Sequence, residues 1–244
     1  MLKLILMLVL RLSYAETEKI TDSYFDQFGT DIKSPWVNTE SRNVVIGGSA
    51  LTLALLIGED QIVDPAQEEV TDHKPLGKYS KYGDMAGQVY PNLAYVLGMW
   101  SYSYFSPESQ AANHAVLMLK STLYAGLVST SLKAIVREPR PYDSNVKTSF
   151  PSGHTTTAFA FAGTVASLHE WYWGLAGYTM ASAVAFSRMN DNRHYIHDVV
   201  AGATIGLSYG LALSNHTMKK DEMVNQAILL PTEDGLLAKY IFNY

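Results

Sequence analysis

The sequence predicts an all-α fold, a six-helix bundle in which the candidate catalytic residues converge at one end. Long apolar stretches, each closed by proline, glycine or charged residues, have the length of helices rather than of strands. No stretch alternates apolar and polar residues as a half-buried strand would, and no short-period repeat is present. The short and medium connections favour neighbouring helices that run antiparallel.

The first half of the chain supplies two of the six helices. An apolar stretch over 44–58 is the first, and it ends where charged residues begin. Residues 59–84 are charged and contain two prolines, which predicts a long connection. An apolar and aromatic stretch over 85–105 is the second helix, and Pro107 closes it.

The second half supplies the other four helices. Residues 111–136 form the third, which Pro139 and Pro141 end because proline cannot continue the helical hydrogen-bond ladder. The predicted fourth, fifth and sixth helices span 153–168, 171–187 and 195–214. Because helix direction alternates in such a bundle, the end of the third, the start of the fourth, the end of the fifth and the start of the sixth share one end.

The termini are separate from the bundle, which occupies residues 41–215. Residues 1–15 predict a signal peptide or an N-terminal anchor, because Lys3 precedes an apolar run that small residues close. Residues 16–40 are a polar lead-in, and residues 216–244 form a C-terminal tail that is mostly polar.

Composition narrows the function classes. The net charge of -5 argues against a general nucleic-acid binder, so no nucleic-acid partner is expected. The absence of cysteine excludes disulfides, thiolate catalysis and cysteine metal sites. Few uncharged runs reach the about 20 residues that a membrane span needs. With 48% hydrophobic and 17% charged residues, membrane association is expected, and a soluble form stays open as the alternative.

Three cations fall at the shared end of the bundle. Lys133 lies in the last turns of the third helix, Arg140 follows its end, and Arg188 lies at the end of the fifth. A phosphoryl group in transfer carries charge on three oxygens and needs several fixed cations. The helix dipole alone also favours cations at helix C-termini, but three of them beside two histidines predict an anion site.

Ser152 and Gly153 open the fourth helix, and His154 follows them. Free N–H groups at a helix start point at an anion, and the helix dipole favours negative charge there. Gly153 permits a phosphate to approach the backbone closely. Ser152 also fits a plain N-cap, so its role in anion binding depends on the neighbouring cations.

His194 and Asp198 are four residues apart and share one face of the sixth helix. A carboxylate that holds one imidazole nitrogen fixes the tautomer and leaves the other nitrogen as the nucleophile. His197 is the competing histidine, but it points elsewhere around the helix. No metal site is predicted, because the surrounding cations would repel a divalent ion at His194 and Asp198.

These clusters carry a resemblance to the type 2 phosphatidic acid phosphatase superfamily. The residues that match its three-part signature, each with the family spacing, are Lys133 with Arg140-Pro141, then Pro151-Ser152-Gly153-His154, then Ser187-Arg188 with His194 and Asp198. Three motifs in the correct order are a specific signal, whereas any one of them alone would be weak.

The resemblance implies a metal-independent phosphatase that works through a phosphohistidine and needs no cofactor. In that mechanism His194 is the nucleophile and Asp198 orients it. His154 is the general acid that protonates the leaving oxygen, and then the base that activates water. The groups implied to hold the phosphoryl oxygens are Lys133, Arg140, Ser152, the Gly153 amide and Arg188.

The resemblance leaves the substrate open, because the superfamily includes membrane lipid phosphatases, soluble secreted acid phosphatases and vanadate-dependent haloperoxidases. The apolar helices and residues 194–199 resemble the lipid group, which predicts a phosphorylated lipid as substrate. The predicted signal and the polar interruptions resemble the soluble group, which predicts a periplasmic acid phosphatase acting on small phosphate esters. A haloperoxidase is the remote alternative. The expected location is a bacterial-type cell envelope, in the inner membrane or periplasm, with the active site facing the extracytoplasmic side.

Overall fold

The computed structural model describes the backbone of residues 20–107, 109–224, 227–232 and 235–240, and the side chains of 27–107 and 109–214. The chain divides into two units, residues 1–34 and residues 35–244. The segment predicted as a signal peptide or anchor, residues 1–15, lies outside the described residues.

Helix α2 (Ile20–Val37) begins in the first unit, within the segment predicted as a polar lead-in. The lead-in is therefore helical from Ile20 onward. Pro35 lies inside α2 and has no N–H to donate to the Asp31 carbonyl, and the Ser34 hydroxyl donates to that carbonyl at 2.8 Å instead.

Six helices of the second unit match the six predicted ones and confirm the all-α fold class. They are α3 (Thr39–Ile57), α6 (Tyr90–Phe105), α7 (Ala111–Val136), α8 (Gly153–Leu168), α9 (Trp171–Asn190) and α10 (Ile196–Val224). Asn38 caps α3, because its side-chain oxygen accepts hydrogen bonds from the backbone N–H groups of Glu40 and Ser41. This cap starts α3 before the apolar stretch that predicted it.

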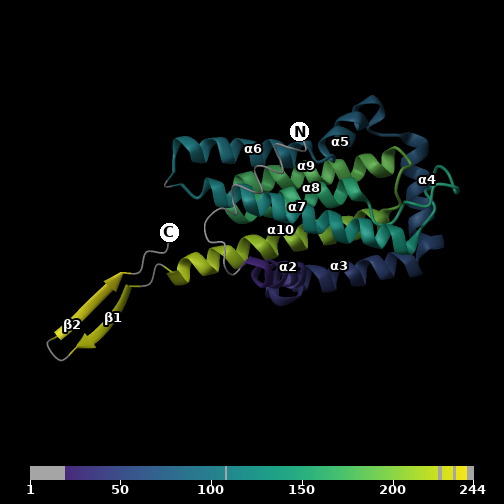
Figure 1. The fold of residues 1–244 in the computed structure, drawn as a ribbon. Coiled ribbons are helices and arrows are strands. Elements are labelled where there is room, and N and C mark those ends of the chain that lie inside the picture. The colour runs from purple at the N-terminus through teal and green to yellow at the C-terminus, as the bar shows by residue number, and fades with distance from the viewer. Residues whose placement is uncertain (1–19, 108, 225–226, 233–234, 241–244) are drawn as a thin grey trace. The chain divides into compact units, whose positions relative to one another are not determined.

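Helix α8 lies at the centre of these helices. It packs against α7, α9 and α10, while α3 packs on α10 and α6 packs on α7 (Figure 1). The contact between α8 and α10 is close because α10 presents glycines to it. A Cβ atom on Gly202 would come within 2.5 Å of the Ser152 carbonyl oxygen, and one on Gly206 would overlap the carbonyl of Thr156.

Residues 59–84, predicted as a connection, are mostly helical. They form a π-helical turn (Glu59–Val63), α4 (Asp64–His73), a 3-10 turn (Gly77–Tyr79) and the start of α5 (Ser80–Ala86). Pro65 lies in the first turn of α4, where its missing N–H would have had no helical partner. Both α4 and α5 pack on α9, so this segment covers part of the bundle.

The predicted polar tail contains a hairpin. Strand β1 (Ala227–Thr232) pairs antiparallel with β2 (Gly235–Tyr240), with Ala227 opposite Tyr240. The sequence did not predict these strands.

Three helices among the described residues are long and apolar enough to cross a membrane. They span Thr39–Ile57, Ala111–Val136 and Ile196–Ser214.

Candidate active site

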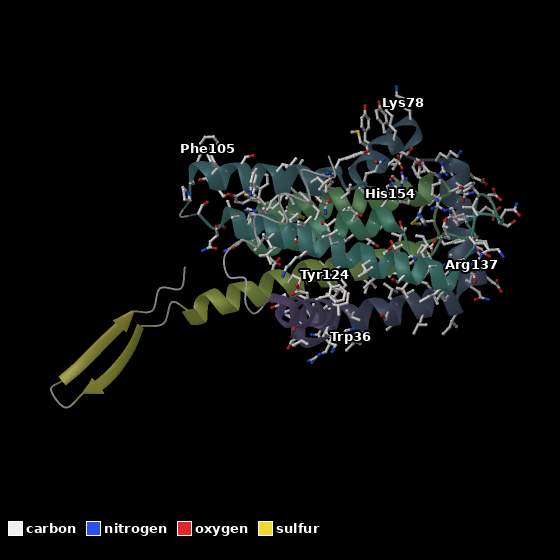
Figure 2. The ribbon with its side chains drawn as sticks, in the orientation of Figure 1. Trp36, Lys78, Phe105, Tyr124, Arg137 and His154 are labelled. Atoms are coloured by element: carbon white, nitrogen blue, oxygen red, sulfur yellow. The ribbon has the colours of Figure 1, made fainter. Side chains whose placement is uncertain are left out.

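The structure brings the three motifs together at one end of the bundle, as alternating helix direction predicted. The Ser152 amide donates a hydrogen bond to the Asp198 carbonyl at 3.0 Å, which joins the start of α8 to the start of α10. Lys133 Nζ lies 2.7 Å from the Pro151 carbonyl, which joins α7 to the second motif. Figure 2 shows Arg137, just after α7, at the opposite end of the bundle from Phe105, the last residue of α6.

Asp198 is fully buried and its carboxylate is fixed on one side by three groups. Oδ2 accepts a hydrogen bond from the Ser149 hydroxyl at 2.6 Å and another from the Tyr195 amide at 2.9 Å. The same oxygen lies 3.4 Å from His194 Nδ1. Asp198 therefore faces the ring of His194, as the four-residue spacing predicted.

His194 lies in the loop just before α10 and is only 2% exposed. With Nδ1 directed at Asp198, the other ring nitrogen, Nε2, is the one available to attack phosphorus. Burial lowers the pKa of His194 below its ordinary value, although the Asp198 carboxylate acts in the opposite direction. The ring is therefore neutral near neutral pH, which is the form a nucleophile needs.

The start of α8 provides backbone N–H groups beside these side chains. Ser152 is the N-cap of α8 and is fully buried, and its Oγ accepts a hydrogen bond from Thr155 Oγ1 at 3.0 Å. A Cβ atom built on Gly153 would meet no other atom within 4 Å. An anion can therefore approach this helix start without a steric conflict.

Lys133 and Arg140 both donate hydrogen bonds to the loop that leads into α8. Lys133 Nζ lies 2.7 Å from the Thr148 carbonyl, 3.3 Å from the Ser149 carbonyl and 2.7 Å from the Pro151 carbonyl. Arg140 donates to the Thr148 hydroxyl through Nε at 3.2 Å. In this arrangement both cations position the loop, and their predicted contact with phosphate stays a prediction.

Arg188 is buried, with 4% of its side chain exposed, and its guanidinium is held by two carboxylates. Nη2 donates to Asp191 Oδ2 at 3.3 Å, and Nη1 forms a close ion pair with Asp84 Oδ1. The same oxygen of Asp84 lies 3.3 Å from His154 Nε2. Asp84 therefore bridges a predicted phosphate-binding residue and the predicted general acid.

His154 has an unusual electrostatic environment. Burial lowers its pKa to about 4, and the positive charge of Arg188 acts in the same direction, whereas Asp84 raises the pKa. A bound phosphate dianion would also raise this pKa, because it places negative charge beside the ring. The protonated form that a general acid needs is therefore favoured by substrate.

His197, predicted as the competing histidine, is fully buried and directs its Nε2 at Glu138. Its Nε2 shares a hydrogen bond of 2.7 Å with Glu138 Oε1 and lies 3.6 Å from Asp198 Oδ1. Glu138, His197 and Asp198 offer ligand atoms that all lie within 4.8 Å of one another. A nitrogen that donates to Glu138 carries a proton, so the pair is better described as support for Asp198 than as a metal site.

Sequence analysis missed three residues at this site: Asp84, Glu138 and Ser149. Glu138 and Ser149 lie close to motif residues in the sequence, and this proximity is the signal by which they could have been found, although it does not identify their partners. Asp84 carries no such signal, because it lies 104 residues before its partner Arg188.

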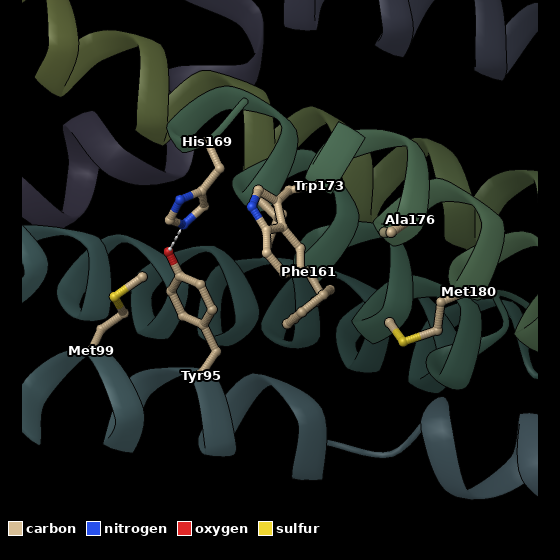
Figure 3. A pocket seen from close by; sticks show the side chains of 9 residues that line it. Tyr95, Met99, Phe161, His169, Trp173, Ala176 and Met180 are labelled. Carbon is tan, nitrogen blue, oxygen red and sulfur yellow. Dashed lines mark hydrogen bonds between the residues drawn. The ribbon is translucent and has the colours of Figure 1, made fainter. Parts of the chain in front are cut away.

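An apolar cavity of about 470 Å³ lies between α6, α8 and α9. Figure 3 shows Tyr95 and Met99 of α6, Phe161 of α8 and Trp173 of α9 around it. Its polar groups include the Tyr95 hydroxyl, which shares a hydrogen bond of 2.6 Å with His169 Nε2. Phe161 follows His154 by seven residues, so the cavity begins about 10 Å along α8 from the site.

Comparisons of sequence find similarity to a known family over the segment that carries these motifs. Residues 114–221 match the model of the PAP2 superfamily, and this segment contains all three motifs. A lipid A 1-phosphatase from Porphyromonas gingivalis is 41% identical over 96 residues, which are 38% of this chain and 21% of that protein. A PA-phosphatase related-family protein from Dictyostelium discoideum is 27% identical over 138 residues, 47% of this chain and 48% of that protein. The chain thus spans half or less of the length of these curated relatives.

Two solved structures share the fold. The crystal structure of Aquifex aeolicus LpxE aligns with a TM-score of 0.54 at 18% identity, covering 63% of this chain and 95% of that one. A PAP2 type phosphatidylglycerolphosphate phosphatase from Bacillus subtilis aligns with a TM-score of 0.59 at 19% identity, covering 72% and 97%. The segment that carries the three motifs therefore matches the PAP2 superfamily model, and these two structures share its fold.

Proposed function

We propose that this protein is a metal-independent phosphatase that removes phosphate from a lipid through a phosphohistidine intermediate. The observation that carries the proposal is the buried pair of His194 and Asp198, 3.4 Å apart, at a site that also contains three cations and a helix start. A neutral, oriented imidazole beside an anion-binding pocket has the features that nucleophilic attack on phosphorus requires.

The reaction proceeds in two steps at this site. In the first, His194 Nε2 attacks phosphorus, the bond from phosphorus to the leaving oxygen breaks, and His154 gives that oxygen its proton. In the second, His154 takes a proton from water, the water oxygen attacks phosphorus, and the bond to His194 breaks. Arg188, the Ser152 side chain and the Gly153 amide stabilise the charge on the phosphoryl oxygens in both steps.

Three observations support a lipid substrate. The cavity between α6, α8 and α9 has the apolar lining that a hydrocarbon chain prefers, and it begins about 10 Å along α8 from His154. One curated relative is named a lipid A 1-phosphatase, and one structural neighbour is named a phosphatidylglycerolphosphate phosphatase. Three helices are apolar enough to cross a membrane.

The exposed side chains support an embedded protein. In α3, Ile46, Leu51 and Leu53 are each more than half exposed, and in α6 Tyr104 and Phe105 are about 80% exposed. Large apolar surfaces of this kind are rare on soluble monomers and fit lipid contact. That the active site faces the extracytoplasmic side of a bacterial-type envelope stays a prediction.

A direct test measures phosphate release by the purified protein from p-nitrophenyl phosphate and from a long-chain lipid phosphate. We expect His194→Ala to abolish both activities and an acid-labile phosphoryl-enzyme to be trapped from the wild type. His73→Ala, at an exposed histidine of α4, is the matched control and should retain activity. Activity in His194→Ala near that of the wild type would refute the nucleophile assignment.

The lipid preference has its own test in the cavity. Ala176→Phe places a ring in the cavity, whereas Leu175→Phe makes a similar change at a neighbouring exposed position of α9. We expect Ala176→Phe to raise KM for the long-chain lipid phosphate and to leave p-nitrophenyl phosphate hydrolysis unchanged. An equal effect of both variants, or none, would show that the hydrocarbon chain lies elsewhere.

A further inference from the structure

Asp84 is the one carboxylate in the described part of the site that touches both His154 and a predicted phosphate-binding residue. Its Oδ1 lies 3.3 Å from His154 Nε2 and forms a close ion pair with Arg188 Nη1. Asp191 also contacts Arg188, at 3.3 Å, but no contact joins it to His154. Both carboxylates contact Arg188, and the contact with His154 distinguishes Asp84 from Asp191.

Short-range packing delivers Asp84 to this position. A Cβ atom on Gly83 would overlap the Ser187 hydroxyl, and one on Gly87 would lie 2.6 Å from Val184 Cγ1 and 2.8 Å from His154 Cβ. These glycines stand on either side of Asp84, and their missing side chains let α5 and the residue after it lie directly against α9 and His154. The Asp84 carboxylate reaches His154 and Arg188 because the backbone of α5 lies directly against them.

We propose that Asp84 is a positioning residue for the acid–base step: it holds the Nε2–H group of His154, stabilises the protonated ring and leaves the other ring nitrogen, Nδ1, for the leaving oxygen. His154 and Asp84 then form a second carboxylate–histidine pair beside His194 and Asp198, in which the carboxylate contacts Nε2 instead of Nδ1. One pair prepares the nucleophile and the other prepares the acid. This inference rests on the proposed phosphatase function.

The chemistry of the first step follows from this arrangement. When His194 attacks, the proton on His154 Nδ1, the ring nitrogen that Asp84 does not hold, moves to the leaving oxygen, and the electron pair of the breaking bond to phosphorus becomes that oxygen's O–H bond pair. The imidazole left behind is neutral. The anionic carboxylate stabilises the imidazolium form before transfer, and so raises the fraction of enzyme that can donate.

Substrates with different leaving groups distinguish a role of Asp84 in the acid step from a purely structural role. An alkyl phosphate releases a strongly basic alkoxide and needs the proton, whereas p-nitrophenyl phosphate releases a weak base and needs it little. The constant to measure is kcat/KM, because it covers the steps only as far as release of the leaving group. General acid–base catalysis contributes roughly 10²- to 10⁴-fold, so the loss of its support is measurable.

The test uses full-length protein with Asp84→Asn, an isosteric change that removes the charge, and Asp191→Asn as the matched variant. For Asp84→Asn we expect kcat/KM to fall about tenfold or more with an alkyl phosphate and by less than about threefold with p-nitrophenyl phosphate. We also expect the alkaline limb of kcat/KM to move to lower pH. The charged and titratable groups that act on His154 there are Asp84 of α5, Arg188 of α9, and His194 and Arg140 of the loops. Asp191→Asn should leave the ratio of the two substrates unchanged.

Each other outcome overturns the inference. An equal loss with both substrates would make Asp84 only a support for Arg188 or for folding. A gain in activity or in phosphate affinity would make Asp84 an anion that competes with substrate for Arg188. A shift of the substrate ratio in Asp191→Asn as well would assign the effect to Arg188. A wild-type protein that hydrolyses neither ester would instead refute the proposed function itself.

Discussion

Ser149→Ala removes a hydrogen bond on which the orientation of Asp198 depends. The Ser149 hydroxyl donates to Asp198 Oδ2 at 2.6 Å, and both residues are fully buried. A hydrogen bond to a charged group contributes about 1.5–3 kcal/mol, and each 1.36 kcal/mol in the activation barrier is a factor of about ten. If the whole of this energy orients the nucleophile, kcat falls about 10- to 150-fold.

The expected loss lies in the lower part of that range, about 10- to 30-fold, because the Tyr195 amide still donates to the same oxygen at 2.9 Å. KM should change little, since Ser149 contributes no side chain to the predicted phosphate site. The assay is steady-state hydrolysis of p-nitrophenyl phosphate by the purified variant.

Ser121→Ala is the matched control for this prediction. Ser121 is also a fully buried serine, and its hydroxyl shares a hydrogen bond of 2.8 Å with Thr164 within the α7–α8 contact. Ser121→Ala should lower the free energy of unfolding by an amount similar to that of Ser149→Ala, and it should leave kcat unchanged. A kcat of Ser149→Ala within threefold of the wild type, or an equal loss in Ser121→Ala, would refute the role assigned to Ser149.

Three further predictions concern charge at the site. Glu138→Gln keeps the shape of the partner of His197 but replaces a charged hydrogen bond by a neutral one. We expect the free energy of unfolding to fall by about 1 kcal/mol and the melting temperature by about 2–4 °C, measured against the exposed variant Glu68→Gln. An unchanged melting temperature would contradict the pairing of Glu138 with His197. Because burial lowers the pKa of His154 to about 4, and the acid must be protonated, kcat/KM should fall as pH rises through the mildly acidic range. The fall of kcat with rising pH should occur at higher pH than the fall of kcat/KM, since bound phosphate raises the pKa of His154. A fall of both constants at the same pH would count against His154 as the acid. Treatment with a chelator should leave activity unchanged and orthovanadate should inhibit, and recovery of chelator-lost activity by magnesium would overturn the metal-free mechanism.

The sequence predicted the bundle and the convergence of the motifs for a simple reason. The residues from Lys133 to Asp198 lie at helix ends, and alternating helix direction decides which ends meet. The four-residue spacing likewise predicted that His194 and Asp198 would face each other, and they lie 3.4 Å apart.

What the sequence did not predict depends on contacts between distant residues. Ser149 lies 49 residues from Asp198, Glu138 lies 59 from His197, and Asp84 lies 104 from Arg188. Local patterns carry no information about such pairs. Residues 59–84 show the same effect, because charge and two prolines predicted a connection, whereas packing on α9 stabilises α4 and α5 as helices.

The glycines of α10 divide this protein into two parts with different freedom to change. Close contact at Gly202 and Gly206, with the hydrogen bond from the Ser152 amide to the Asp198 carbonyl, fixes the predicted nucleophile and the predicted phosphate site in one backbone frame. Almost any larger residue in that contact would disturb both at once. The α4–α5 segment packs chiefly on α9, so its outer surface, away from Asp84 and Gly87, is free to vary in evolution or be exchanged in design while the reacting groups keep their geometry.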